Sequence, residues 1–172
     1  RKLYMEGGVV RGISEIGCAK GTTIKVKDLF FNLPARYKYL KSDQTELAHI
    51  IDVVTPIAIC HSSIGFKLIH NGHELLNFPA VKDLLNNLVN IYGKELVRNL
   101  LPVTTQAAAD EQKTDQEQDQ DTEECPITIS GYISKPTMTR GDRTYQSLYV
   151  NDRHVQSRLV SDAIKDAYRT LV

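Results

Sequence analysis

Alternating apolar and polar residues predict several short strands along this chain. Residues 22–28 place Ile24 and Val26 between polar neighbours, the pattern of a half-buried strand. Two apolar runs flank Asn71-Gly72, the dipeptide that most favours a two-residue hairpin turn. Residues 126–134 and 145–151 alternate in the same way, with a bulge expected at Gly131. We expect the strands at 127–133 and 145–151 to lie in one sheet covered by the last helix.

Other segments carry the helical spacing of apolar residues or helix-start signals. Pro34 suits a first helical turn, and Ser157 is expected to cap the last helix. Another helix is expected to start at Asp43 with Glu46 as its capping partner, and Pro56 is expected to end or kink it. The predicted helices cover residues 35–40, 43–55, 80–92, 94–101 and 158–171. Mixed strands and helices with antiparallel hairpins, and no internal repeat, indicate an α+β protein.

Composition sets broad limits. The chain has 172 residues, 41% of them hydrophobic, and no apolar run approaches the roughly 18 residues of a membrane span. Its three cysteines are scattered, which favours neither a disulfide framework nor a zinc site and indicates a reducing compartment. A first residue other than Met, followed at once by strand-like sequence, indicates a fragment of a longer protein.

The formal net charge of zero hides two opposite regions. Residues 106–125 hold eight acidic residues and one basic residue, so 20 basic and 13 acidic side chains remain in the other 152 residues. The acidic segment has no apolar period and is expected to be a disordered insert. The basic remainder favours polyanionic partners.

The basic residues of the last predicted helix form one stripe. Arg158, Lys165 and Arg169 line up opposite its apolar side, and Arg153 precedes them in a predicted loop. Such charges are typical of a solvated helix face, and Asp162 lies close to the same stripe. Taken alone, the pattern favours a solvated face over a phosphate-binding surface.

Catalytic motifs are absent from the sequence. It has no GxSxG, HExxH or GxxxxGK[ST] motif, and its five histidines include no metal-binding pair on a helix. We therefore predict no catalytic residue and no metal ligand in this chain.

Two blocks resemble one known family. "GTTIKVKDLFFNLPARYKYLK", at residues 21–41, and "TYQSLYVNDRHVQSRLVSDAIKDAY", at residues 144–168, are similar to the MutL family of DNA mismatch-repair proteins. In that family the first block, GTxVxVxxLFxNxPAR, is the last nucleotide-site motif of a GHKL-type ATPase domain, and the second leads into the last helix of a transducer domain. Asp152 replaces the usual Gly of the VNGR motif, with little consequence expected because Asp tolerates a positive φ.

The resemblance implies an architecture and a set of sites. It implies the end of a GHKL-type ATPase sandwich at residues 1–78, then a transducer domain at 79–172 with an uncommon left-handed βαβ crossover of the ribosomal-protein-like type. ATP and Mg²⁺ would be cofactors of the parent protein, which is implied to be an ATPase, but the family's ExxxN and DNGxG motifs do not occur ahead of Gly21. The implied nucleotide-binding residues are Gly21, Thr22 and Thr23, and the implied DNA-binding residues are Arg153, Arg158, Lys165, Arg169, Arg36 and Lys38.

The implied function is an ATP-gated DNA-binding clamp that couples mismatch recognition to repair. Its implied partners are DNA, bound through the phosphate backbone, a MutS-type mismatch-recognition protein, and a second copy of the chain or a MutL-type paralogue. No membrane partner is implied. We favour a cytoplasmic, nucleoid-associated prokaryotic protein; a eukaryotic one would be nuclear. Two alternatives stay open: a transducer segment of another GHKL ATPase, such as a type II topoisomerase subunit or chaperone, and a plain interaction module.

Overall fold

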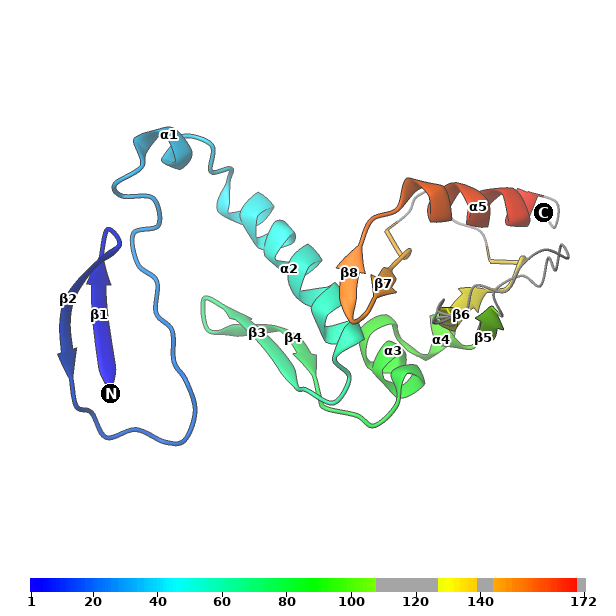
Figure 1. Cartoon of the computed structure of the whole chain (residues 1–172), viewed down its shortest axis with the longest axis horizontal. Helices are drawn as coiled ribbons and strands as arrows, with labels where there is room; N and C mark the ends of the chain where they lie inside the picture. Colours follow the sequence, from blue (N-terminus) through cyan, green and yellow to red (C-terminus); the bar gives the residue numbers. More distant parts are fainter. Residues whose placement is uncertain (108–126, 139–143, 170–172) are drawn as a thin grey trace, which may run out of the picture. The chain divides into compact units, whose positions relative to one another are not determined.

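The computed structural model describes residues 1–107, 127–138 and 144–169 (Figure 1). It divides into two compact units, Arg1–Ile50 (unit 1) and Ile51–Val172 (unit 2), each considered by itself below. The described strands form four two-stranded antiparallel sheets. Helices accompany these hairpins, so the predicted mixture of helices and antiparallel strands is confirmed.

Unit 1 begins with a hairpin. Strands β1 (Lys2–Glu6) and β2 (Val9–Ser14) are joined by Gly7 and Gly8, whose φ angles of 57° and 86° suit a two-residue turn that L side chains rarely adopt. The side chain of Asn32 lies against Gly7, where a Cβ would come within 3.3 Å of Asn32 Nδ2. Gly7 therefore leaves room for the corner that precedes helix α1.

The strand predicted at residues 22–28 does not form. This segment has no paired strand in unit 1, and Ile24 and Val26 are 84% and 69% exposed. A strand requires a neighbour for its backbone N–H and C=O groups, and β1 and β2 pair only with each other. Helix α1 (Pro34–Tyr37) follows with Pro34 in its first turn, as predicted, but it ends before Leu40.

Helix α2 (Asp43–Cys60) continues past Pro56, which was predicted to end or kink it. At its start Ser42 Oγ accepts from Thr45 N–H at 3.4 Å, and Glu46 Oε1 accepts from Lys41 N–H at 2.7 Å, so the capping pattern is shifted by one residue. After Pro56 the helix buries Ala58 and Ile59. We attribute the extra turn to this burial, which offsets the hydrogen bond that proline cannot donate.

The hairpin around Asn71-Gly72 is confirmed. Strands β3 (Phe66–His70) and β4 (His73–Phe78) pair across the turn, where Asn71 and Gly72 have φ angles of 50° and 78°. Helix α3 (Leu84–Tyr92) begins four residues later than predicted. Asp83 fixes that start, because its Oδ1 accepts from Asn86 N–H at 2.8 Å. Gly93 ends the helix with a φ of 84°, as the sequence indicated.

The helix predicted at 94–101 is shorter than expected and gives way to a strand. Helix α4 (Lys94–Val97) leads into β5 (Leu100–Ala107), which pairs with β6 (Ile127–Ser134). Val103 lies directly opposite Gly131 in an unbroken register, so the bulge expected at Gly131 is absent. The first two residues of the predicted acidic insert belong to β5; residues 108–125 lie outside the described part of the chain.

The C-terminal elements are a short hairpin and a helix. Strands β7 (Leu148–Val150) and β8 (Arg153–Val155) pair with each other and precede α5 (Arg158–Arg169). The prediction of one sheet containing residues 127–133 and 145–151 is wrong, because β6 pairs with β5 and β7 pairs with β8. Strand β5 pairs with β6 along eight residues, whereas β7 has only three, so β5 satisfies more of the backbone N–H and C=O groups of β6. All described pairs are antiparallel, so the handedness of a βαβ crossover stays a prediction.

The core of unit 2 forms where α2 ends. Ile59, Leu88 and Val97 make a buried cluster from α2, α3 and α4, with Tyr132 and Tyr149 packed against it. Asn87 is also buried, only 2% exposed, and its Nδ2 donates to the Ala58 and Ile59 carbonyls at 2.8 and 3.2 Å. This amide satisfies carbonyls that the last turn of a helix otherwise leaves without a partner.

Replacing Asn87 by Ala should destabilise the fold. The change leaves both carbonyls without a donor in a buried site, so we expect the free energy of unfolding to fall by about 1–3 kcal/mol. Urea denaturation followed by circular dichroism measures this. The matched control is Asn90→Ala on the exposed part of α3, which should leave stability unchanged or slightly higher. Equal effects of the two substitutions would show that the Asn87 amide does not hold α2 to α3.

Candidate nucleotide and nucleic-acid sites

The proposed nucleotide-binding residues lie in an exposed extended segment of unit 1. Gly21 has a φ of 143°, and a Cβ built on it would meet no atom within 4 Å. Thr22 and Thr23 are exposed beside it. The backbone here is open to close approach by a ligand.

Arg36 and Lys38 lie a short distance further along unit 1. Arg36 is in the last turn of α1 and Lys38 is its C-cap, and both are exposed. The corner before the helix contains two non-glycine residues with positive φ, Asp28 at 49° and Phe30 at 65°. Their carbonyls accept from Phe31 and Leu33 N–H at 3.0 and 2.9 Å, which closes two consecutive turns. Sequence reasoning missed these positions, because only the backbone shows this rare conformation for a bulky residue.

Arg153 lies in strand β8, where the sequence had indicated a loop. The β7–β8 turn consists of Asn151 and Asp152, with φ angles of 48° and 61°. Both residues tolerate the left-handed region, and the turn closes with Val150 opposite Arg153. Asp152 thus takes the turn conformation expected of it in place of glycine.

Two hydrogen bonds fix this hairpin on the end of α2. Tyr149 Oη donates to the Pro56 carbonyl at 2.9 Å, and Cys60 Sγ donates to the Asp152 carbonyl at 3.2 Å. Burial raises the pKa of Tyr149 to about 12. Burial and then the nearby Asp152 carboxylate raise the pKa of the Cys60 thiol. Arg153 is therefore carried by a hairpin whose turn and strand are both anchored.

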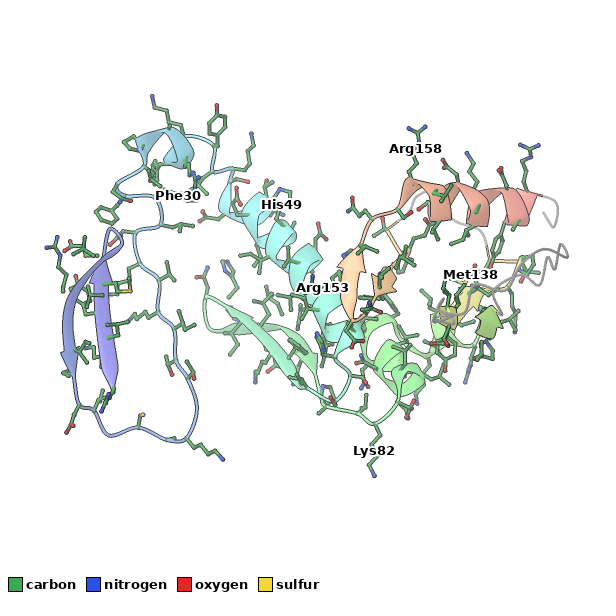
Figure 2. The ribbon with its side chains drawn as sticks, viewed as in Figure 1. Phe30, His49, Lys82, Met138, Arg153 and Arg158 are labelled. Atoms are coloured by element: carbon green, nitrogen blue, oxygen red, sulfur yellow. The ribbon has the colours of Figure 1, made fainter. Side chains whose placement is uncertain are left out.

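Helix α5 presents the other basic candidates. Ser157 caps it as predicted, with Oγ accepting from Val160 N–H at 3.3 Å. Arg158 projects from its first turn (Figure 2), and its side chain stays 92% exposed even though Nε lies 3.5 Å from Asp162 Oδ2. Lys165 and Arg169 follow on the same stripe and are also exposed.

The apolar side of α5 is only partly covered. No described residue of the helix is buried, and Leu159, at the edge of the apolar arc, is 82% exposed. Tyr168 is half-buried and hydrogen-bonds Ser134 at the end of β6. The helix thus rests on the sheet near its last turn.

The six proposed DNA-binding residues fall in different units. Unit 2 holds Arg153 and the three residues of α5, whereas Arg36 and Lys38 belong to unit 1. Within the described ranges, no group of three or more His, Cys, Asp or Glu side chains is arranged to hold a metal ion. None of the described helices is long and apolar enough to cross a membrane.

Known proteins match nearly the whole chain. A family model described as "DNA mismatch repair protein, C-terminal domain" matches residues 88–172. The "DNA mismatch repair protein MutL" of Methanoculleus marisnigri is 36% identical over 171 residues, which are 99% of this chain and 26% of that protein. The MutL of Geobacillus kaustophilus is 39% identical over 99% of this chain and 24% of its own length. The chain therefore spans about a quarter of the curated relatives it matches.

Two solved structures share the fold. One, described as the Aquifex aeolicus MutL ATPase domain complexed with ADP, has a TM-score of 0.68 and 21% identity over 95% of this chain and 56% of its own. The other, the N-terminal domain of a DNA repair protein, has a TM-score of 0.76 and 24% identity over 95% of this chain and 49% of its own. The architecture is that of a GHKL-type ATPase segment followed by a transducer domain. The chain belongs to the MutL family of DNA mismatch repair proteins.

Removing the Tyr149 hydroxyl should loosen the hairpin that carries Arg153. Tyr149→Phe deletes the bond to the Pro56 carbonyl, and we expect unfolding free energy to fall by about 0.5–1.5 kcal/mol. Because the pKa of Tyr149 is higher in the folded protein than in the unfolded chain, the protonated hydroxyl stabilises the fold fully below about pH 10. This stabilisation is lost as pH rises through 12. Urea midpoints across that range should therefore fall more steeply for the unmodified chain than for Tyr149→Phe. Tyr39→Phe, at an exposed tyrosine of unit 1, is the control; the same pH dependence in all three proteins would contradict the assignment.

Proposed function

We propose that this chain is the segment of a MutL-type mismatch repair protein that joins its ATPase site to a DNA-binding surface. The observation that carries the proposal is the placement of Arg153 and Arg158. The anchored hairpin presents Arg153. Arg158 extends from the capped start of α5 with its side chain 92% exposed. Because the chain belongs to the MutL family, we favour a DNA-contacting role for these two residues over an ordinary solvated face.

Contact through phosphates suits the chemistry of this surface. Guanidinium and ammonium groups on exposed side chains bind phosphate oxygens, and such contacts position a protein on DNA without reading sequence. Lys165 and Arg169 would continue the contact along α5. Arg36 and Lys38 are secondary candidates, because the corner that carries them also packs against Gly7.

The nucleotide role rests on the Gly21-Thr22-Thr23 segment. Its open backbone and position in the GTT motif support contact with ATP in the parent protein, with Mg²⁺ as the companion ion. The Aquifex relative, described as complexed with ADP, supports a nucleotide site in this family fold. We place the boundary between the ATPase and transducer parts at residues 78 and 79.

The parent protein would act as an ATP-gated clamp. ATP would order its N-terminal part and dimer, and the transducer part would hold DNA while a MutS-type protein reports the mismatch. The dimer partner is a second copy or a MutL-type paralogue, and the compartment is that of the cell's DNA: the prokaryotic cytoplasm, or the nucleus in a eukaryote. The comparisons do not favour a topoisomerase subunit or chaperone.

Charge reversal at Arg153 and Arg158 tests the DNA surface. In the full-length protein, the double variant Arg153→Glu/Arg158→Glu should weaken binding about equally on duplexes of unrelated sequence. The dependence of log K on log salt should flatten by about 0.9 for each phosphate that the variant no longer neutralises. Fluorescence anisotropy over a salt series measures both. Lys82→Glu, an exposed residue of unit 2 shown in Figure 2, is the control and should change neither. Unaltered affinity and slope in the double variant would mean that the two arginines form only a solvated surface.

Catalysis requires more of the protein than these 172 residues. The family's Glu base and metal-binding Asn do not occur ahead of Gly21, so this chain alone should hydrolyse ATP no faster than the buffer. A phosphate-release assay with the chain and with the full-length protein checks this. Turnover by the chain that disappears in Thr22→Ala or Thr23→Ala would show that the active site is complete here and that the assignment of the missing parts is wrong.

A further inference from the structure

Four elements of unit 2 meet at one corner, at the far end of α5 from Arg158. Tyr168 Oη donates to the Ser134 carbonyl, and Ser134 Oγ donates to Tyr168 Oη at 3.4 Å. These two bonds attach the last turn of α5 to the end of β6. Arg169, the residue after Tyr168, lies at this corner.

Lys135 and Arg98 lie at the same corner. Lys135 follows Ser134 directly, and its backbone N–H donates to the Asn99 carbonyl at 2.8 Å. Its Nζ donates to the Arg98 carbonyl at 3.1 Å. Arg98 is the C-cap of α4, and one residue, Asn99, separates it from β5. Hydrogen bonds therefore join the three chain segments that carry Arg98, Lys135 and Arg169, and we name these three residues the corner cluster.

The charges of the corner cluster are not neutralised by the described acidic residues. The Lys135 ammonium bonds a carbonyl, which is dipolar but carries no net charge. Glu95 and Asp166 are near in sequence, but neither forms an ion pair with the cluster within the described ranges. Arg98 and Arg169 are exposed, so their guanidinium groups are open to an anionic ligand.

We propose that the corner cluster is a second phosphate-binding site, which extends DNA contact from Arg153 and Arg158 to the opposite end of α5. This proposal rests on the proposed function, since DNA phosphate is the ligand in both. The 11-residue step from Arg158 to Arg169 spans about 16 Å at 1.5 Å per residue. One DNA strand carries a phosphate about every 3.4 Å along its axis, so the two ends of the helix match phosphates four or five nucleotides apart. Lys165 lies on the same stripe between them.

Lys135 also has a structural role, which the experiment must separate from ligand binding. Its ammonium donates to the carbonyl of Arg98, the C-cap residue of α4, and Lys side chains commonly bond the carbonyls at a helix C-terminus. A glutamine amide can still donate to that carbonyl but carries no charge. Arg98→Gln/Lys135→Gln therefore removes the two charges while it keeps a donor at the cap.

The test measures duplex DNA affinity of the full-length protein over a salt series, on two duplexes of unrelated sequence. In Arg98→Gln/Lys135→Gln the slope of log K against log salt should flatten by about two units, equally on both duplexes. Arg98→Lys/Lys135→Arg, which keeps both charges, should retain the slope. Lys82→Gln should leave it unchanged, and the urea midpoint of each variant reports whether the fold is kept.

The outcomes separate this proposal from the broader one. An unchanged slope in the glutamine variant, with a reduced slope in Arg153→Glu/Arg158→Glu, overturns the corner cluster and leaves the proposed DNA surface intact. A lowered urea midpoint with an unchanged slope assigns Lys135 to capping alone and also overturns it. If the unmodified protein shows no salt-dependent affinity for duplex DNA, the proposed function itself fails.

Discussion

The buried amide of Asn87 is the contact on which the arrangement of unit 2 depends. Helix α2 ends inside the core, where its last carbonyls cannot reach water, and the amide on α3 supplies the missing donors. Because Ile59 is fixed in this way, it packs with Leu88 and Val97, and three helices share one core. The same helix end also receives the hairpin that carries Arg153. The end of α2 thus meets both the core, through Asn87, and the hairpin of the DNA surface that we propose.

Local signals in the sequence predicted the elements whose causes are local. The Asn71-Gly72 hairpin, the start of α1 at Pro34 and the cap at Ser157 formed as expected, because each depends on residues next to it. The errors have non-local causes. A strand at 22–28 requires a partner, the turn of α2 after Pro56 depends on burial, and the pairing of β6 with β5 depends on a strand that helical spacing had concealed.

The candidate sites were predictable only in part, for a related reason. Periodicity placed Arg158, Lys165 and Arg169 on one stripe, since a single helix fixes that relation. It could not place Arg98 beside Lys135, because their proximity depends on the β5–β6 pairing. The role of the VNDR turn came from resemblance to a family, and the structure adds the bonds from Tyr149 and Cys60 that hold it.

The capped start and the attached last turn of α5 have an energetic consequence for any anion that binds along this helix. Ser157 caps the first turn and the Tyr168–Ser134 pair attaches the last turn to β6, so the backbone beneath the basic side chains is already ordered. Binding then immobilises only the side chains themselves, at about 0.5–1.5 kcal/mol each, and no segment has to fold on contact. Because little conformational freedom is lost, more of the interaction energy of each contact along α5 remains as binding affinity.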